Sequence, residues 1–280
     1  MYPLLDAAID RGATVSVVLP ALNEEATVGD VVRQVLTYPR FHEVIVVDAD
    51  STDATAEVAW TAGATVVTQS SIRPDVPSLQ GKGDTMWRGL NVATGDIIVF
   101  MDSDLQGDVS TWAPLLAQEA LRSGAALTKG FYARAHGVDP NGGGRTTEIM
   151  ARPFLNAFWT ETANLRQPLG GEYALRADFA RSVSFPANYA VEVSLVIDAI
   201  ERGECIAQVD LGRKTHESQS TLDLGKMSFQ IMHEITRRLG LTDASRVLTQ
   251  YRDGVPVEYT LGAYAALPAI DHAQPTLIAV

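Results

Sequence analysis

Cysteine is almost absent from this chain of 280 residues, which contains only Cys205. A single thiol excludes a disulfide within the chain and any cysteine-rich metal site. Cys205 opens a short, partly apolar segment that is typical of a strand. We therefore expect it to be a small buried residue without a chemical role.

Long hydrophobic runs are also missing. No apolar stretch approaches the ~20 residues that a membrane-spanning helix requires. The first ten residues lack the basic segment and the apolar run of a signal peptide. These absences predict a soluble, intracellular protein that is located in the cytoplasm and has no membrane partner.

Positive charge is scarce, with 22 Lys and Arg residues against 34 Asp and Glu residues and a formal net charge of −12 at pH 7. Such an acidic surface does not favour nucleic acid or an anionic membrane as a partner. The chain is 46% hydrophobic, which is enough for a sizeable core. It has neither internal repeats nor a linker rich enough to divide it.

The most informative stretch that is present is 96–104. Its five apolar residues, 97–101, predict a buried strand at the centre of a parallel sheet. Asp102 and Asp104 follow at strand spacing, so both carboxylates can point to one place beyond the carboxyl end of the sheet. Two close carboxylates repel each other unless a cation lies between them, and a hard divalent ion that holds a diphosphate is the natural candidate. The alternative is an Asp-rich turn that caps the next helix.

The N-terminal part of the chain repeats one pattern. Residues 15–20, 43–50 and 65–68 are typical of strands, and valines at helical spacing predict a helix over 24–36. Asn23 is a suitable N-cap for this helix. Strands and helices that alternate in this way predict a right-handed parallel α/β sheet.

Two glycine-rich segments could bind an anion. Lys82 lies between two glycines just before a helix, where it can reach a phosphate beside exposed backbone amides, and a solvated loop is the alternative. Residues 141–145 read Asn-Gly-Gly-Gly-Arg and precede a helix predicted over 147–158. Arg145 and Thr147 could there bind a phosphate or a carboxylate, and a flexible surface loop with a capping threonine is the alternative.

Glu192 and His216 are two further candidates. Glu192 lies between valines in the first turn of a helix predicted over 189–202. It is either paired on an exposed helical stripe or held partly buried near the chemistry, and helix N-termini favour Glu in any case. His216 follows a strand predicted over 206–211, which makes it a candidate metal ligand beside Asp104, although a lone histidine on a loop is usually solvated.

Taken as an ordered set, these motifs resemble those of one family. Pro20-Ala-Leu-Asn-Glu24, Asp48-Ala-Asp50 and Asp102-Ser-Asp104 are similar to the nucleotide-sugar half of a GT-A glycosyltransferase. The later segments 142–148, 167–173 and 189–192 resemble the retaining glucosyl-3-phosphoglycerate synthase family. The resemblance runs from about Val15 to Leu239.

The resemblance implies an α/β fold of the GT-A type, with a Rossmann-like, mostly parallel nucleotide-binding sheet, a C-terminal acceptor-binding part and a helical tail. Residues 1–132 would form the nucleotide-sugar half, 133–240 the acceptor-binding and catalytic half of the same domain, and 241–280 a C-terminal extension. The implied reaction moves a hexose, expected to be glucose, from UDP-glucose to the hydroxyl of a small anionic acceptor such as 3-phosphoglycerate. Mg²⁺ or Mn²⁺ is the implied cofactor, and a homodimer is the implied assembly.

The resemblance also implies roles for individual residues. Those that would bind the donor are Pro20, Ala21, Leu22, Glu24, Asp50, Ser51, Lys82, Asp102, Ser103, Leu169 and Gly170. Those that would bind the acceptor are Gly144, Arg145, Thr147 and Ser218. Asp104 and His216 would bind the metal together with the diphosphate. Glu192 matches the family's catalytic carboxylate, which stabilises positive charge at the anomeric carbon or orients the sugar, and front-face attack by the acceptor is the implied route.

One segment departs from the family pattern. After the histidine the family typically shows Arg-Asn-Arg, whereas this chain has Glu217, Ser218 and Gln219. Near a doubly charged phosphoglycerate, each lost or reversed charge is unfavourable by on the order of 1 kcal/mol or more. A related glycosyltransferase of specialised metabolism with a different or less charged acceptor would fit the sequence equally well.

Three other classes fit less well. A sugar-phosphate nucleotidyltransferase usually has a loop rich in glycine and arginine directly after the first strand, where this chain has Pro20-Ala-Leu-Asn23. A non-catalytic nucleotide-sugar sensor would have no use for Glu192. A dinucleotide-dependent dehydrogenase would show G-x-G-x-x-G after the first strand.

Overall fold

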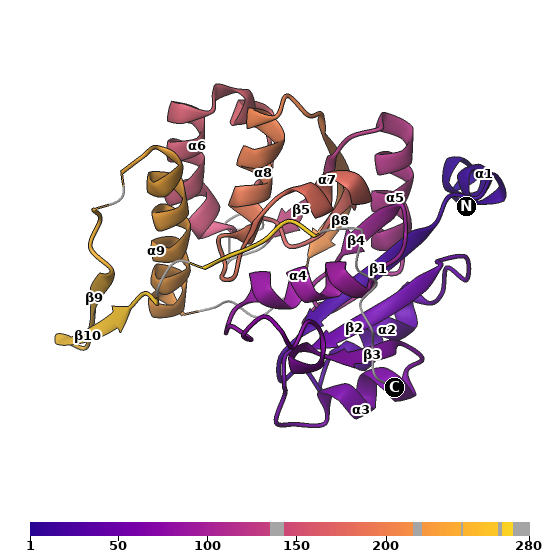
Figure 1. The fold of residues 1–280 in the computed structure, drawn as a ribbon, viewed down its shortest axis with the longest axis horizontal. Helices are drawn as coiled ribbons and strands as arrows, with labels where there is room; N and C mark the ends of the chain where they lie inside the picture. Colours follow the sequence, from indigo (N-terminus) through magenta and orange to yellow (C-terminus); the bar gives the residue numbers. More distant parts are fainter. Residues whose placement is uncertain (135–142, 215–219, 242, 263–264, 271–280) are drawn as a thin grey trace.

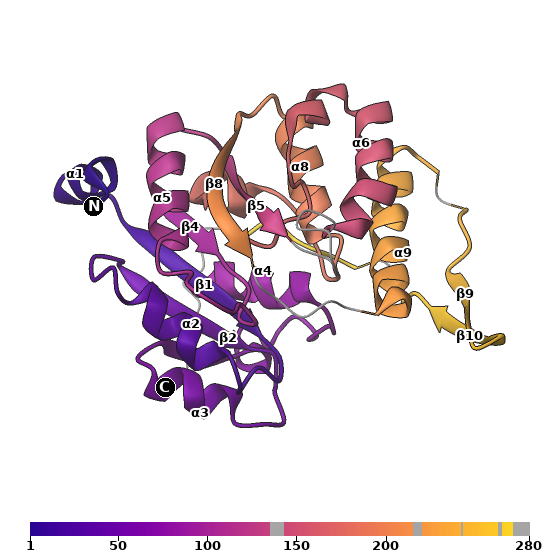
Figure 2. The same cartoon turned by 180° about the vertical axis from the view of Figure 1, so that it is seen from behind.

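The structure is a computed structural model that describes residues 1–134, 143–214, 220–241, 243–262 and 265–270. A seven-stranded sheet crosses the molecule (Figures 1 and 2) in the order β3-β2-β1-β4-β6-β5-β8. Only β6 runs antiparallel to its neighbours within it. The strands are β1 (Val15–Ala21), β2 (Glu43–Asp48), β3 (Thr65–Thr68), β4 (Ile97–Phe100), β5 (Leu127–Arg134), β6 (Tyr173–Arg176) and β8 (Ile206–Lys214).

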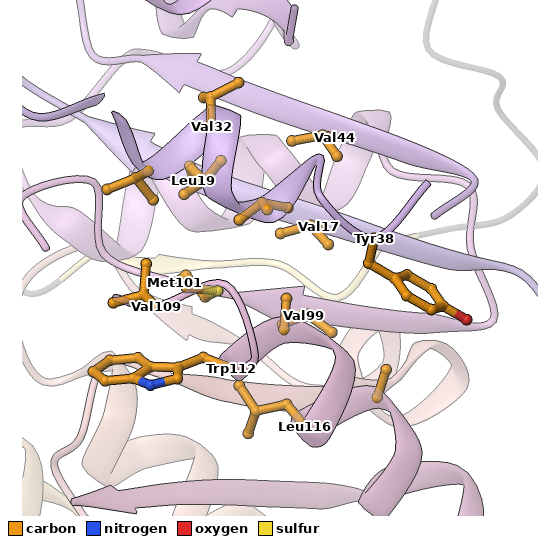
Figure 3. Close-up of a cluster of buried hydrophobic side chains, with 14 of the residues drawn as sticks. Val17, Leu19, Val32, Tyr38, Val44, Val99, Met101, Val109, Trp112 and Leu116 are labelled. Atoms are coloured by element: carbon orange, nitrogen blue, oxygen red, sulfur yellow. The ribbon is translucent and has the colours of Figure 1, made fainter. Parts of the chain in front are cut away.

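Helices cover both faces of the sheet, which explains why β4 is apolar throughout. One face packs on α1 (Pro3–Asp10), α2 (Val28–Val35), α3 (Thr55–Thr61) and α5 (Trp112–Ser123). Figure 3 shows part of this core, with Val17 of β1, Val32 of α2 and Trp112 of α5 around the same interior. The other face packs on α4 (Lys82–Val92), α7 (Ala177–Ser182) and α8 (Val191–Glu201).

A third apolar cluster joins α8 to the helices beside it. They are η2 (Thr147–Ala151), α6 (Arg152–Phe158) and α9 (Thr221–Arg238). Arg238 at the end of α9 donates hydrogen bonds to Asp198 on α8 and to Glu234 on its own helix, at 2.7 and 2.8 Å. This partly buried ion pair fixes α9 against α8, and α9 forms the helical tail of the domain.

Smaller elements complete the chain. The pair β9 (Val247–Arg252) and β10 (Val255–Thr260) forms an antiparallel hairpin at the edge of the molecule, beyond α9 (Figure 1). The pair β7 (Phe185–Pro186) and β11 (Ala266–Leu267) forms a second, two-residue ladder. Two short 3₁₀ helices are η1 (Gln69–Ser71) and η3 (Thr160–Asn164). In the described part of the chain, no helix combines the length and the apolar character that crossing a bilayer requires.

The predicted α/β class and the predicted strands are confirmed, and two local predictions are wrong. Asn23 does not cap a helix, because α2 begins only at Val28 and Asn23 adopts a left-handed conformation with φ of 56°. Cys205 is exposed rather than buried, since it precedes the first residue of β8.

Gly83, in the first turn of α4, allows this helix to lie directly against β7. A Cβ atom at this position would overlap the carbonyl oxygen of Pro186 and lie 3.0 Å from the carbonyl carbon of Ala187. Both are backbone atoms, so a side chain could be accommodated only if α4 or β7 moved.

We expect Gly83→Ala to lower the free energy of unfolding by about 1–3 kcal/mol, because overpacking between two backbones cannot be relieved by a rotamer change. The measurement is the urea midpoint at constant m-value. Gly262→Ala is the matched control, since no atom of the described residues would lie within 4 Å of a Cβ atom added there. Equal stability of the two variants would contradict the close contact between α4 and β7.

Candidate active site

A cavity of about 580 Å³ opens at the carboxyl ends of β1 and β4, where an α/β sheet is expected to bind ligands. Segments from the whole domain meet there. The residues predicted from the sequence that line it are Pro20, Ala21, Leu22, Glu24, Lys82, Asp102, Ser103, Asp104, Gly144, Arg145, Thr147, Leu169 and Glu192. Asp50, Ser51 and Gly170 do not line it, and His216 and Ser218 lie outside the described residues.

Lys82 lies between two carboxylates of this cavity. Its Nζ is 2.7 Å from Oδ1 of Asp102 and 2.8 Å from Oε1 of Glu192. Burial alone would lower the pKa of Lys82, but the two carboxylates outweigh it and hold this pKa well above its usual value. Glu192 is buried in the first turn of α8. It therefore has the buried position near the chemistry that was one of the two predictions, and it does not lie on an exposed helical stripe.

Asp102 also contacts a second lysine. Its Oδ2 accepts a hydrogen bond from Nζ of Lys214 at 2.9 Å. Burial would raise the pKa of Asp102, but Lys214 and Lys82 together hold it well below the usual range. The described cations next to this carboxylate are therefore two ammonium groups.

Lys214 and Tyr132 also line the cavity, and they form a buried chain of charges with Glu172, which lies behind the cavity wall. Nζ of Lys214 lies 2.6 Å from Oε1 of Glu172, whose Oε2 accepts a hydrogen bond from the Tyr132 hydroxyl at 2.7 Å. None of the three residues was predicted from the sequence, and Lys214 was not expected at the site because the strand that became β8 was predicted to end at residue 211. Gly212, at φ of 85°, and a register shift against β5 allow the strand to continue to Lys214.

Asp104 differs from Asp102 in its surroundings. It is exposed, and it forms no ion pair with any described residue. Although the residue is exposed to solvent, the neighbouring protein partly desolvates its carboxyl group, and this desolvation, followed by the nearby charge of Asp102, raises the pKa of Asp104. A bound cation would remove this repulsion, which makes Asp104 the carboxylate of the site that is best placed for a metal.

Among the described residues, no cluster of three or more His, Cys, Asp or Glu side chains could hold a metal ion. A Mg²⁺ ion is typically bound by one or two carboxylates together with waters and substrate phosphates. Asp104 beside a cavity of this size fits such a partial set.

The loop after β1 is fixed by hydrogen bonds to neighbouring segments. Ser103 donates its hydroxyl hydrogen to the carbonyl oxygen of Pro20 at 2.8 Å. The backbone N–H of Asn23 donates to Oγ of Ser51 at 2.9 Å, and Oδ1 of Asn23 accepts from the N–H of Thr52 at the same distance. Ser51 therefore supports the loop from behind instead of lining the cavity.

Asp50 and Gly170 have supporting positions as well. Oδ1 of Asp50 accepts a hydrogen bond from the Ser70 hydroxyl at 2.7 Å. The carbonyl oxygen of Gly170 accepts one from the buried ammonium of Lys129, next to Leu169, which does line the cavity. Burial lowers the pKa of Lys129 to about 8.

Another part of the cavity wall contains both polar and apolar residues. Gly144, at φ of 77°, introduces Arg145 and Thr147, and the N–H of Gly143 donates to the carbonyl oxygen of Arg134 on β5 at 2.9 Å. The cavity is also lined by four residues that were not predicted from the sequence, Tyr189, Leu224, Met227 and Ile231. Helical spacing on α9 was the available signal for the last three, but it predicted core residues equally well.

Comparison with known proteins places the chain in a family. Residues 16–169, more than half of the chain, match the family model of glycosyl transferase family 2. The chain is 44% identical over 253 residues to glucosyl-3-phosphoglycerate synthase of Mycolicibacterium smegmatis, a match that covers 87% of this chain and 84% of that protein.

Solved structures agree with this match. Glucosyl-3-phosphoglycerate synthase from Mycobacterium tuberculosis in complex with Mn²⁺, UDP-glucose and phosphoglyceric acid superimposes with a TM-score of 0.88. The two sequences are 38% identical, and the match covers 96% of this chain and 94% of that one. A complex of the same protein with Mg²⁺ and uridine diphosphate gives a TM-score of 0.87 with the same identity and coverage. The chain described here therefore belongs to the glucosyl-3-phosphoglycerate synthase family of GT-A glycosyltransferases.

Proposed function

We propose that this chain is a retaining glucosyltransferase that moves glucose from UDP-glucose to the hydroxyl of 3-phosphoglycerate, with Mg²⁺ or Mn²⁺ as cofactor. The observation that supports this most is the row formed by Glu192, Lys82 and Asp102 inside the cavity. It puts a cation and two carboxylates between the loop after β1 and the segment around Arg145. The complexes of the mycobacterial relative contain the same classes of ligand.

The nucleotide-sugar half, residues 1–132, would bind the donor. We propose that Pro20, Ala21, Leu22 and Glu24 contact the uracil and ribose. Ser51 would act through the hydrogen bond that fixes this loop, and Asp50, which is bonded to Ser70, would support the donor site from the loop after β2. Asp102 and Ser103 would contact the ribose and sugar, with Leu169 and Gly170 beside the sugar, and Lys82 would contact the donor.

Asp104 and His216 would hold the metal. When bound, the ion neutralises charge on the departing nucleotide diphosphate and so makes it a better leaving group. Asp104 is suited to this role because it lies at the cavity without a described counter-ion.

Glu192 would act at the sugar. Its carboxylate is buried in the cavity wall, where a negative charge interacts strongly with positive charge that develops at the anomeric carbon. Lys82 holds this carboxylate in place and balances its charge before the donor arrives. We propose front-face attack by the acceptor, the route that the family resemblance implies.

The half formed by residues 133–240 would bind the acceptor. Gly144, Arg145 and Thr147 line the cavity on this side and would bind the phosphate or carboxylate, with Ser218 as a further contact. The replacement of two basic residues after His216 favours a second candidate, the same reaction with a less charged hydroxy acid.

The direct test is a coupled assay of UDP release from UDP-glucose with Mg²⁺, in the presence and absence of 3-phosphoglycerate. We expect strong stimulation by 3-phosphoglycerate. Slow hydrolysis without stimulation would contradict the acceptor, and an acceptor panel that includes uncharged and singly charged hydroxy acids would then identify the replacement.

Asp104→Asn should lower turnover by about 100-fold or more, because the metal loses its charged protein ligand. Wild-type turnover should be lost with a chelator and restored by Mg²⁺. The control is Asp108→Asn, an exposed aspartate of the same loop. If Asp104→Asn kept metal-dependent turnover, Asp104 would not be a ligand of the metal.

Glu192→Gln should lower kcat by about 100-fold while the KM for UDP-glucose changes little, because the amide keeps the size of the side chain but lacks its charge. Glu201→Gln at the other end of α8 is the control. An unchanged kcat would show that Glu192 has only a structural role.

We also propose a cytoplasmic homodimer. The support for the dimer is the hairpin beyond α9, which exposes Tyr251 and Val255 to solvent by 69% and 62%. This hairpin is part of the proposed C-terminal extension, residues 241–280.

A further inference from the structure

Lys214 and Glu172 form a buried ion pair that no step of the proposed reaction uses. Their side chains are 3% and 0% exposed, and the two charged groups are 2.6 Å apart. Leaving a buried carboxylate without its partner is strongly unfavourable. Glu172 is completely buried behind the cavity wall, so any effect that it has on a ligand must act through the groups that it contacts.

The pair is connected to the cavity through Asp102. Oδ1 of Asp102 accepts from Lys82 and Oδ2 accepts from Lys214, at 2.7 and 2.9 Å. Glu172 is satisfied in the same way, by Lys214 on one oxygen and by Tyr132 on the other. Lys214 is thus shared between a carboxylate of the cavity and a carboxylate of the interior.

The two lysines on Asp102 differ in what else they contact. Among the described residues, Lys82 forms ion pairs only with carboxylates of the cavity, Asp102 and Glu192, so a donor phosphate can draw it away from either. Lys214 is fixed from behind by Glu172, and its ammonium could move away from Asp102 only by breaking or weakening this buried ion pair. Of the two, Lys214 is the one that stays with Asp102 when a donor binds.

Gly171 holds the same carboxylate from another side. A Cβ atom on Gly171 would lie 2.5 Å from Oδ1 and 2.6 Å from Oδ2 of Asp102. The backbone next to Glu172 therefore packs directly on the Asp102 carboxylate, which leaves this group little freedom to move.

We propose that Lys214, held by Glu172, is a positioning residue that fixes the carboxylate of Asp102 for the donor sugar while Lys82 turns to the donor. This inference rests on the proposed function, since it takes UDP-glucose as the ligand of Asp102. It extends that function to Lys214 in the cavity wall and to Glu172 behind it.

The test measures kcat, the KM for UDP-glucose and the KM for the acceptor in Glu172→Gln and Lys214→Met. Both should lower kcat/KM for UDP-glucose by about tenfold to a hundredfold, mostly through KM, because a displaced carboxylate contacts the sugar poorly. The acceptor KM should stay unchanged. Lys214→Arg should recover most of the loss, since a guanidinium can reach both carboxylates.

The matched control is Glu234→Gln, which removes a carboxylate that is 1% exposed and paired with Arg237 and Arg238 away from the cavity. Its Tm should fall as in Glu172→Gln, but its KM for UDP-glucose should not change. If Glu172→Gln lost stability like the control and kept the wild-type KM, the ion pair would be merely structural and the proposal would be wrong.

Gly171→Ala is a second, independent variant that keeps every charge. Its added methyl group should displace Asp102 and raise the KM for UDP-glucose in the same way, and this result decides the case if Glu172→Gln fails to fold. An unchanged KM in Gly171→Ala and in a folded Lys214→Met would overturn the positioning role alone. A wild-type protein that does not bind UDP-glucose in calorimetry would overturn the proposed function and this inference together.

Discussion

The structure depends on one shared cation, the ammonium of Lys82 between Asp102 and Glu192. Without it, the buried carboxylate of Glu192 and the partly buried carboxylate of Asp102 would repel each other and resist burial. Lys82 begins α4, Asp102 follows β4 and Glu192 begins α8, so this interaction fixes the point where two helices and the central strand meet. The close contact of Gly83 with β7 also fixes this point, because it holds the first turn of α4, which contains Lys82, against β7.

The first four strands of the sheet and the place of the ligand site could be predicted from the sequence. Apolar runs bounded by turns predicted β1, β2, β3 and β4, since a parallel sheet that is covered on both faces leaves no polar alternation in its strands. The acids after these strands predicted a ligand site at their carboxyl ends. Lys82, Asp102 and Glu192 were each candidates, but spacing along a chain does not give distances between elements, so their mutual contact required the structure.

Other features of the site could not be predicted, because they depend on local backbone geometry and on contacts between distant segments. Lys214 was missed because Gly212 looked like the end of a strand, whereas a bulge against β5 continues β8 as far as Lys214. Asn23 has the composition of a helix cap, but it uses its side chain to join two loops. Glu172 lies in the segment 167–173 that resembles the family, but its burial and its partners could not be predicted, since a single glutamate beside glycines is equally typical of an exposed turn. Buried ion pairs between distant strands leave no periodic trace in a sequence.

The account therefore describes a donor site in which charge is balanced before the ligand arrives. The most direct measurement is a crystal structure of the protein with UDP-glucose and Mg²⁺. We expect the glucose to lie against Glu192 and Asp102 and the ion to lie on Asp104. Lys214 should keep its contacts with Asp102 and Glu172 while Lys82 turns toward the donor. A sugar bound elsewhere, with Lys82 still bridging Asp102 and Glu192, would contradict these expectations.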